Sequence, residues 1–282
     1  KLPLLKNSDK TNVLPNQKPI YLEEQNLDIH NVSTLREDGN RLKVRIEITN
    51  PKNLEISGII IENMEVQITD KRTLNGITYV ELIASPTKYY DNYQIKEIKY
   101  YEDGKENSKN TYYLIQEAFY KEITKYEDWQ NIDKESYENY RLLADLDFAG
   151  KQDVNNSLKI NRLVTEGEKH TIKNITLESK DRKVSIIEES KNLIENVTFE
   201  NITIKAPYNY LGVISNNMGD IQNVDFNNIN VEAEGNNSIG VIGINSGKLQ
   251  NIKLNNINII GQTKVGGLVG ETDDTIINNI VG

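Results

Sequence analysis

The sequence predicts a mainly β protein in which an immunoglobulin-like β-sandwich, a short capping helix and a parallel β-solenoid follow one another. The solenoid is predicted by a repeat: IQNVDFNNINV at 221–231 returns as LQNIKLNNINI at 249–259, with the apolar and Asn positions kept. Runs of apolar residues and Gly between the copies, such as SIGVIGI, support it. The sandwich is predicted by short strand-like segments, separated by turn residues, that precede the repeats.

The chain is expected to begin with a linker at 1–24, a polar segment that contains Pro3, Pro15 and Pro19. Seven strand-like runs follow within 25–117, from LDIHNVSTL to TYYLIQ, and turn signals such as DGN, NPKN, TLNG and EDGKENSKN separate them. Antiparallel strands of this number and spacing are typical of an immunoglobulin-like sandwich. The chain has no Cys pair that would make this prediction finer.

A short amphipathic helix is predicted within 118–135, where AFYKEITKYEDWQNI can place Tyr120, Ile123 and Trp129 toward one side. We expect this segment to connect the two units and to cap the solenoid. A cap is needed because a bare first coil would expose strand N–H and C=O groups that have no partner.

The solenoid is predicted to occupy 136–282. Its first coil is expected at SYENYRLLADLDFAG, with Leu142 or Leu143, Leu146 and Phe148 facing inward. The last segment, TIINNIVG, breaks off within a repeat. We therefore expect a solenoid that is truncated at its C-terminal end, in a chain that is a fragment of a larger protein.

Five copies of the repeat align, and the alignment predicts two columns of Asn. The first column contains Asn174, Asn196, Asn223, Asn251 and Asn279, and the second contains Asn201, Asn228 and Asn256. Apolar residues alternate with polar ones beside each column, which is the period of a half-buried strand. The alternation resets at the Asn positions, so we expect corners there. Side-chain amides at equivalent corners of stacked coils can bond to one another as a ladder.

A third strand is predicted between the copies, at YLGVIS, SIGVIGI and KVGGLVG, with Gly212, Gly240 and Gly267 in one column. Three short strands per period, joined by Asn and Gly corners, are typical of one coil of a parallel β-solenoid, whose coils are about 4.8 Å apart. The rival interpretation is a stack of unrelated hairpins. It is disfavoured because hairpins would not keep Asn in register across the copies.

Composition argues against several function classes. Lys and Arg number 33 against 42 Asp and Glu, and a net charge of -9 leaves no strongly basic surface, so no nucleic acid partner is expected. The absence of Cys removes disulfides, thiolate metal ligands and a Cys nucleophile. No run of 18 apolar residues occurs, and no membrane insertion is expected.

The chemically active side chains form no recognisable catalytic motif. His30 and His170 are the only His residues, no His-Glu-x-x-His is present, and a structural or solvent role is favoured over zinc ligation for both. Asp145 and Asp147 alternate along a strand and could hold calcium or act as an acid–base pair, although a solvated outer face is the favoured alternative. We therefore expect no catalytic, cofactor-binding or metal-binding residue in this chain.

Tyr is abundant, with 15 residues, and Tyr89, Tyr90 and Tyr93 form one cluster. If exposed, these rings would offer a platform for contact with a sugar or a protein partner. Packing within the sandwich is the favoured alternative.

Several segments resemble those of bacterial surface proteins. The runs SIGVIG and VGGLVG, each with a strand on either side, resemble the GLUG repeat, and EDWQNI followed by YRLLADLDFAG is similar to the usual opening of such a solenoid. The preceding sandwich contains ITNPKNLEISGIIIEN and YYDNYQIKEIKYYEDG. The combination resembles the N-terminal region of the zinc metalloproteases of streptococci and their relatives that cleave immunoglobulin A.

The resemblance implies a virulence factor that is secreted or attached to the cell wall of a Gram-positive bacterium, with zinc bound further along the parent chain. It implies the immunoglobulin A heavy chain and the remaining domains of the parent as partners. Because the family's His-Glu-x-x-His is absent here, no catalytic residue is carried over. The chain is then expected to be a non-catalytic module that engages the substrate or acts as a scaffold. Two alternatives stay open: an adhesin segment that binds host glycan or matrix protein, and a solenoid enzyme that cleaves polysaccharides.

Overall fold

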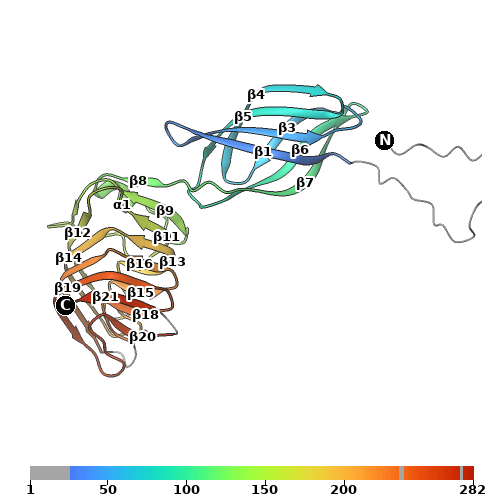
Figure 1. Cartoon of the computed structure of the whole chain (residues 1–282). Coiled ribbons are helices and arrows are strands. Elements are labelled where there is room, and N and C mark those ends of the chain that lie inside the picture. Colours follow the sequence, from blue (N-terminus) through green and yellow to red (C-terminus); the bar gives the residue numbers. More distant parts are fainter. Residues whose placement is uncertain (1–25, 235–237, 274–275) are drawn as a thin grey trace, which may run out of the picture.

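The N-terminal unit consists of two antiparallel sheets in the computed structural model (Figure 1). The structure describes residues 26–234, 238–273 and 276–282, and the linker expected at 1–24 lies outside them. One sheet has the strand order β1-β2-β5-β4, and the other has the order β3-β6-β7. The strands are β1 (Asp28–Glu37), β2 (Arg41–Thr49), β3 (Glu55–Ile61), β4 (Met64–Leu74), β5 (Ile77–Pro86), β6 (Tyr93–Glu102) and β7 (Lys105–Ile115).

Alternation along the strands produces the core of this unit. In β2, Leu42, Val44, Ile46 and Ile48 are fully buried, while the residues between them are exposed or half-buried. The inward side chains of both sheets join in one apolar cluster. Burial of each such side chain stabilises the fold by about 2 kcal/mol. Each of the seven strand-like segments read from the sequence forms a strand.

Two-residue turns reverse the chain at Asn75-Gly76 and at Asp103-Gly104. Asn75 and Gly76, between β4 and β5, have φ values of 52° and 75°, and Asp103 and Gly104, between β6 and β7, have φ values of 53° and 73°. Two successive positive φ values are typical of the type I′ turn, whose twist matches that of the paired strands. The segment EDGKENSKN at 102–110, which the sequence suggested as a turn, is therefore mostly strand. Only Asp103 and Gly104 form the turn, and β7 begins at Lys105.

The connection between the two units is partly extended, which corrects the helix predicted within 118–135. Lys121–Ile123 forms β8, which pairs in parallel with β9 (Glu138–Leu142), and the helix α1 is limited to Tyr126–Gln130. The strand is favoured at Ile123 because pairing satisfies its backbone while its side chain is buried. No helix in the described part of the chain is long and apolar enough to cross a membrane.

From β9 onward the chain winds into a parallel β-solenoid of about five turns (Figure 1). One path of paired strands runs β10-β12-β14-β17-β19-β16-β13-β11-β9-β8, and β15, β18 and β20 form a further parallel ladder. The strands after β9 are β10 (Leu146–Asp147), β11 (Leu158–Val164), β12 (His170–Glu178), β13 (Ile187–Glu195), β14 (Val197–Ala206), β15 (Ile214–Asn217), β16 (Asp220–Gln222), β17 (Asp225–Ala233), β18 (Ile242–Asn245), β19 (Leu249–Ile260), β20 (Val269–Thr272) and β21 (Ile277–Val281).

Equivalent residues of successive coils lie over one another inside the solenoid. Phe199 in β14 pairs with Phe226 in β17, and their rings stack with centroids 5.4 Å apart and planes 9° apart. Leu254 in β19 continues the same column, where it is half-buried. Burial is lower here because β19 pairs with β21 only as far as Lys253, so no further strand of the described residues covers Leu254 on its second side.

The interior of the first coil agrees with the prediction and shows which of the two candidate Leu residues faces inward. Leu142, Leu146 and Phe148 are buried, whereas Leu143 is 40% exposed. Trp129 of α1 packs edge-on against Phe148, with ring centroids 5.9 Å apart, and belongs to the same core.

The predicted Gly column is wrong at its last member, Gly267. Ile239 pairs in parallel with Val265, so the position equivalent to Gly240 is Gly266. A Cβ on Gly266 would lie 1.9 Å from a backbone carbonyl oxygen, whereas a Cβ on Gly267 would meet nothing within 4 Å. Gly is required only at the first of these positions, because only there does the backbone approach so closely.

Candidate functional site

All eight Asn residues of the predicted columns lie at corners where the backbone is left-handed. Their φ values range from 52° to 63°. Asn adopts this conformation more readily than most residues with a Cβ, because its short side chain bonds locally. The residues are Asn174, Asn196, Asn201, Asn223, Asn228, Asn251, Asn256 and Asn279.

The longer side-chain ladder runs along one corner of the solenoid. Asn256 donates to Asn228 at 2.9 Å, Asn228 to Asn201 at 2.9 Å and Asn201 to Asn174 at 3.1 Å, each from Nδ2 to Oδ1. Asn174 in turn donates to Oδ1 of Asp147 at 2.7 Å. Each Asn of the ladder therefore donates toward the N-terminal coil, and all but Asn256 also accept from the next coil. Asp147 ends the ladder because that position needs only an acceptor.

The predicted alignment of Asn174 with Asn196 is wrong. β12 pairs Lys173 with Glu200, which sets Asn174 against Asn201, 27 residues further on. The sequence favours the wrong partner because Asn-Ile-Thr-Leu at 174–177 matches both Asn-Val-Thr-Phe at 196–199 and Asn-Ile-Thr-Ile at 201–204. The pairing of β12 with β14 selects the second match, and this pairing cannot be read from the sequence alone.

The other Asn column forms a shorter ladder. Asn279 donates to Asn251 at 2.6 Å, and Asn251 donates to Asn223 at 2.9 Å, again from Nδ2 to Oδ1. Asn196 instead donates to Oγ1 of Thr165 at 2.9 Å. Both ladders satisfy polar groups at corners of the solenoid, and their role is structural.

The Tyr cluster is packed against the core of the N-terminal unit. Tyr93 is 1% exposed, and its hydroxyl donates to the carbonyl oxygen of Lys88 at 2.8 Å. Its ring meets Phe119 edge-on, with centroids 5.7 Å apart. Tyr89 and Tyr90 are half-buried against the same core. The idea of three exposed rings that contact a partner is therefore wrong for Tyr93, because its ring fills the core.

The His and Asp candidates form no larger cluster. Nδ1 of His170 lies 3.3 Å from Oδ1 of Asp145, which also accepts from the backbone N–H of Thr171 at 2.9 Å. Asp147 ends the Asn ladder, and His30 is exposed in β1. Among the residues that the structure describes, no group of three or more His, Asp or Glu side chains is arranged to hold a metal ion.

The two units meet at the carboxylate of Asp91, in the loop between β5 and β6. Its Oδ1 accepts from Nε of Arg162 at 2.7 Å and from Nδ2 of Asn139 at 3.1 Å. Its Oδ2 accepts from Nδ2 of Asn192 at 2.8 Å and from Nδ2 of Asn161 at 2.9 Å. These donors belong to β9, β11 and β13, which are neighbours in the solenoid sheet. One side chain of the N-terminal unit thus binds three consecutive coils. We call this cluster the Asp91 junction.

Backbone contacts reinforce the Asp91 junction. The N–H of Asn139 donates to the carbonyl oxygen of Tyr89 at 2.7 Å, and the N–H of Tyr89 donates to Oε2 of Glu138 at 3.0 Å. Nδ2 of Asn139 also donates to the carbonyl oxygen of Phe119 at 3.1 Å. The half-buried Tyr89 therefore has a structural contact through its backbone.

The electrostatics of the junction favour an ionised Asp91. Burial alone would raise the pKa of Asp91, but hydrogen bonds from Asn161, Arg162 and Asn139 offset this effect and hold the pKa below its usual range. The side chains of Asp91 and Arg162 are 22% and 25% exposed. A charge-assisted pair of this kind is stronger than a neutral hydrogen bond. Because both carboxylate oxygens are occupied, the site is suited to holding two units together rather than to proton transfer.

The sequence does not single out Asp91, because one Asp in the loop YYDNY belongs to no motif. Its partners carry a weak signal, since Asn161 donates to Asn139, 22 residues earlier, at 2.7 Å. Their spacing departs from the later repeat because the register shifts between Ile160 and Arg162 in both pairings of β11. A search for a constant period therefore misses them.

Comparison with known proteins identifies no relative: no family model, no curated protein and no solved structure matches the chain.

Proposed function

We propose that the chain is a non-catalytic module that engages the substrate, or acts as a scaffold, in a secreted or cell-wall-attached zinc metalloprotease of the kind that cleaves immunoglobulin A. The resemblance of EDWQNI, YRLLADLDFAG and the Gly-containing repeats supports the family. The Asp91 junction is the observation that best supports the role. A module that holds a partner on two units loses less affinity to ordering when those units are already fixed to each other.

We also infer that the N-terminal unit is an immunoglobulin-like sandwich and that α1 helps to cap the solenoid. The strand orders β1-β2-β5-β4 and β3-β6-β7 correspond to the A-B-E-D and C-F-G sheets of the constant-type immunoglobulin fold. For the cap, support comes from Trp129, whose Nε1 donates to the carbonyl oxygen of Asn155 at 2.8 Å in the first coils.

The adhesin alternative has less support at the Tyr cluster first considered for it. Tyr93 is buried, and Tyr89 is held by the backbone contacts of the junction. A binding role through exposed Tyr rings would have to use other residues, such as Tyr112, which is 83% exposed on β7. We therefore favour the scaffold.

The test compares the parent protease with a form that lacks 136–282, against intact immunoglobulin A and against a short peptide that spans the same scissile bond. We expect kcat/KM for the antibody to fall roughly tenfold or more while peptide cleavage is unchanged, because remote binding is lost and the catalytic groups remain. Undiminished cleavage of the antibody would contradict the proposal. If the deletion also abolishes peptide cleavage, the same comparison is made with Asp91→Ala in the intact parent. Asp38→Ala, in an exposed turn, is the matched control.

A further inference from the structure

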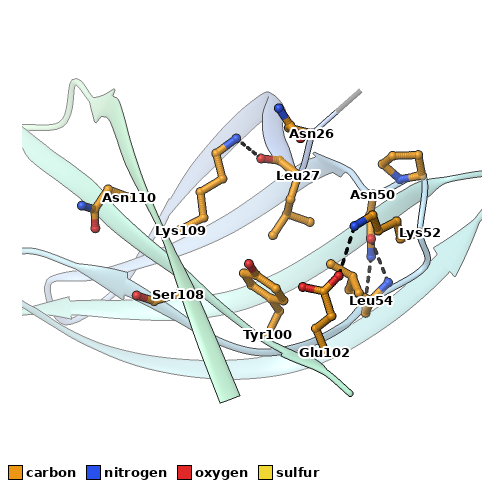
Figure 2. Close-up of a pocket in the computed structure, with 11 residues that line it drawn as sticks. Asn26, Leu27, Asn50, Lys52, Leu54, Tyr100, Glu102, Ser108, Lys109 and Asn110 are labelled. Atoms are coloured by element: carbon orange, nitrogen blue, oxygen red, sulfur yellow. Dashed lines mark hydrogen bonds and ion pairs between the residues drawn. The ribbon is translucent and has the colours of Figure 1, made fainter. Parts of the chain in front are cut away.

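A pocket of about 420 Å³ lies at one end of the N-terminal unit (Figure 2). Its walls come from both sheets: Leu27 precedes β1, the loop 50–54 joins β2 to β3, and Tyr100 and Lys109 lie on β6 and β7. A volume of this size is in the range of sites for small ligands. It is enough for a single sugar ring.

Hydrogen bonds of Asn50 fix one wall of the pocket in the absence of a ligand. Asn50 is fully buried, and its Nδ2 donates to the carbonyl oxygen of Leu54 and to Oγ1 of Thr78, both at 2.8 Å. Its Oδ1 accepts from the N–H of Leu54 at 2.8 Å. These bonds fix the loop 50–54, so a ligand would not have to order it.

The charges of the pocket leave one ammonium without a carboxylate partner. Lys52 at the rim pairs with Glu102 at 3.1 Å. Nζ of Lys109 instead donates to the backbone carbonyl oxygen of Leu27, as the dashed line in Figure 2 shows, and no carboxylate of the described residues lies within ion-pair distance of it. The hydroxyl of Tyr100 makes no hydrogen bond to any described residue. The pocket therefore offers a positive charge, an open hydroxyl and an aromatic ring.

We propose that this pocket binds a sugar ring that carries one carboxylate, of the uronic acid or sialic acid type. Lys109 receives the carboxylate, the Tyr100 hydroxyl and Glu102 bond to sugar hydroxyls, and Leu27 and the Tyr100 ring pack on the apolar face of the sugar. A dianion such as phosphate is disfavoured, because Glu102 lies in the same pocket. This inference is independent of the proposed scaffold role and would hold if that role fails.

The experiment titrates the 15N-labelled chain with three glycosides and follows its amide signals by NMR. Methyl β-D-glucuronide and methyl β-D-glucoside differ only in whether the sugar carries a carboxylate, and the methyl α-glycoside of N-acetylneuraminic acid represents the other class of acidic sugar. We expect at least one acidic glycoside to bind with a Kd on the order of 1 mM and to shift signals of β6, β7 and the loop 50–54. The neutral glucoside should bind roughly tenfold more weakly or not at all, since it cannot pair with Lys109.

Matched variants separate recognition from folding. Lys109→Gln and Tyr100→Phe should each weaken binding several-fold, and Lys109→Arg should retain it. Lys105→Gln on the same strand and Tyr101→Phe at the next position are exposed and should bind as the native chain does. The proposal is overturned if neither acidic glycoside binds, if the glucoside binds equally well, or if a Lys109→Gln variant with native amide signals elsewhere binds unchanged.

Discussion

At the residue scale, each ladder Asn stabilises the solenoid through both its backbone and its side chain. Asn228 has a φ of 54°, donates to Asn201 and accepts from Asn256. The left-handed backbone costs most residues with a Cβ about 1–2 kcal/mol. A hydrogen bond contributes about 1 kcal/mol net. The same residue type therefore meets two separate requirements of the corner.

Substitution of Asn228 separates these two contributions. Asn228→Ala removes the amide and strains the backbone, so we expect unfolding free energy to fall by about 2–3 kcal/mol. Asn228→Gly removes only the amide and should cost about 1 kcal/mol less. The measurement is equilibrium unfolding in urea, with Asn227→Ala as a control that should change little. Equal losses for the Ala and Gly variants would contradict the backbone part of the explanation.

The structural role of a single residue can be predicted from the sequence when that residue recurs in each copy of the repeat. The Asn corners are marked by their recurrence with apolar neighbours, so the sequence identifies them. The partner of Asn174 is not marked, because two later segments fit it equally well. No sequence pattern identifies Asp91, because its role depends on how a loop of the N-terminal unit contacts the side of the solenoid.

At the scale of elements, stacking between coils gives the solenoid its core. The ring of Phe226 lies directly over that of Phe199 and is fully buried. Phe226→Ala would leave a cavity between coils, and we expect a loss of about 3–5 kcal/mol in unfolding free energy. Phe226→Leu should cost clearly less, because Leu254 occupies the same column in the next coil. Urea unfolding of both variants is the check, and a similar cost for the two would argue against this column of stacked side chains.

The Asp91 junction also predicts how stability depends on pH. Because the pKa of Asp91 is lowered in the folded chain, its contribution is present above the unfolded value of about 3.9 and is lost as the pH falls through the folded value. We expect Asp91→Asn to destabilise the chain by roughly 2 kcal/mol at pH 7. The difference from the native chain should shrink toward pH 2.

Thermal unfolding of both chains between pH 2 and pH 7 measures this difference. Comparing the two chains at each pH cancels the effects of other carboxylates with lowered pKa values, such as Asp128 and Asp147. A stability difference that does not change with pH would show that the charge of Asp91 is not what holds the junction.

Elements are predicted well where one periodic pattern dominates and poorly where two compete. The seven strands of the N-terminal unit follow from alternation and turn residues. The segment around Ile123 has helical spacing of its apolar residues, yet it forms β8 because β9 offers a parallel partner. Such pairing joins residues that are distant in the sequence, so local spacing does not reveal it.

At the scale of the whole molecule, we infer from the hydrogen bonds of Asp91 that the two units form one rigid body. The sequence predicts both units, but it does not predict their contact. Residues from one loop and three strands meet there without a shared motif. Rigidity would let the chain present the faces of both units to a partner at a fixed spacing, which is what the proposed scaffold role requires.

Double electron–electron resonance can measure whether the distance between the two units is fixed. The chain has no Cys, so Gln67→Cys on β4 and Thr176→Cys on β12, both exposed, would carry the only two spin labels. We predict a single narrow distance distribution in the otherwise native chain and a clearly broader one when Asp91→Ala is added. A broad distribution in the native background, or no change on adding Asp91→Ala, would show that the Asp91 junction does not hold the two units rigidly together.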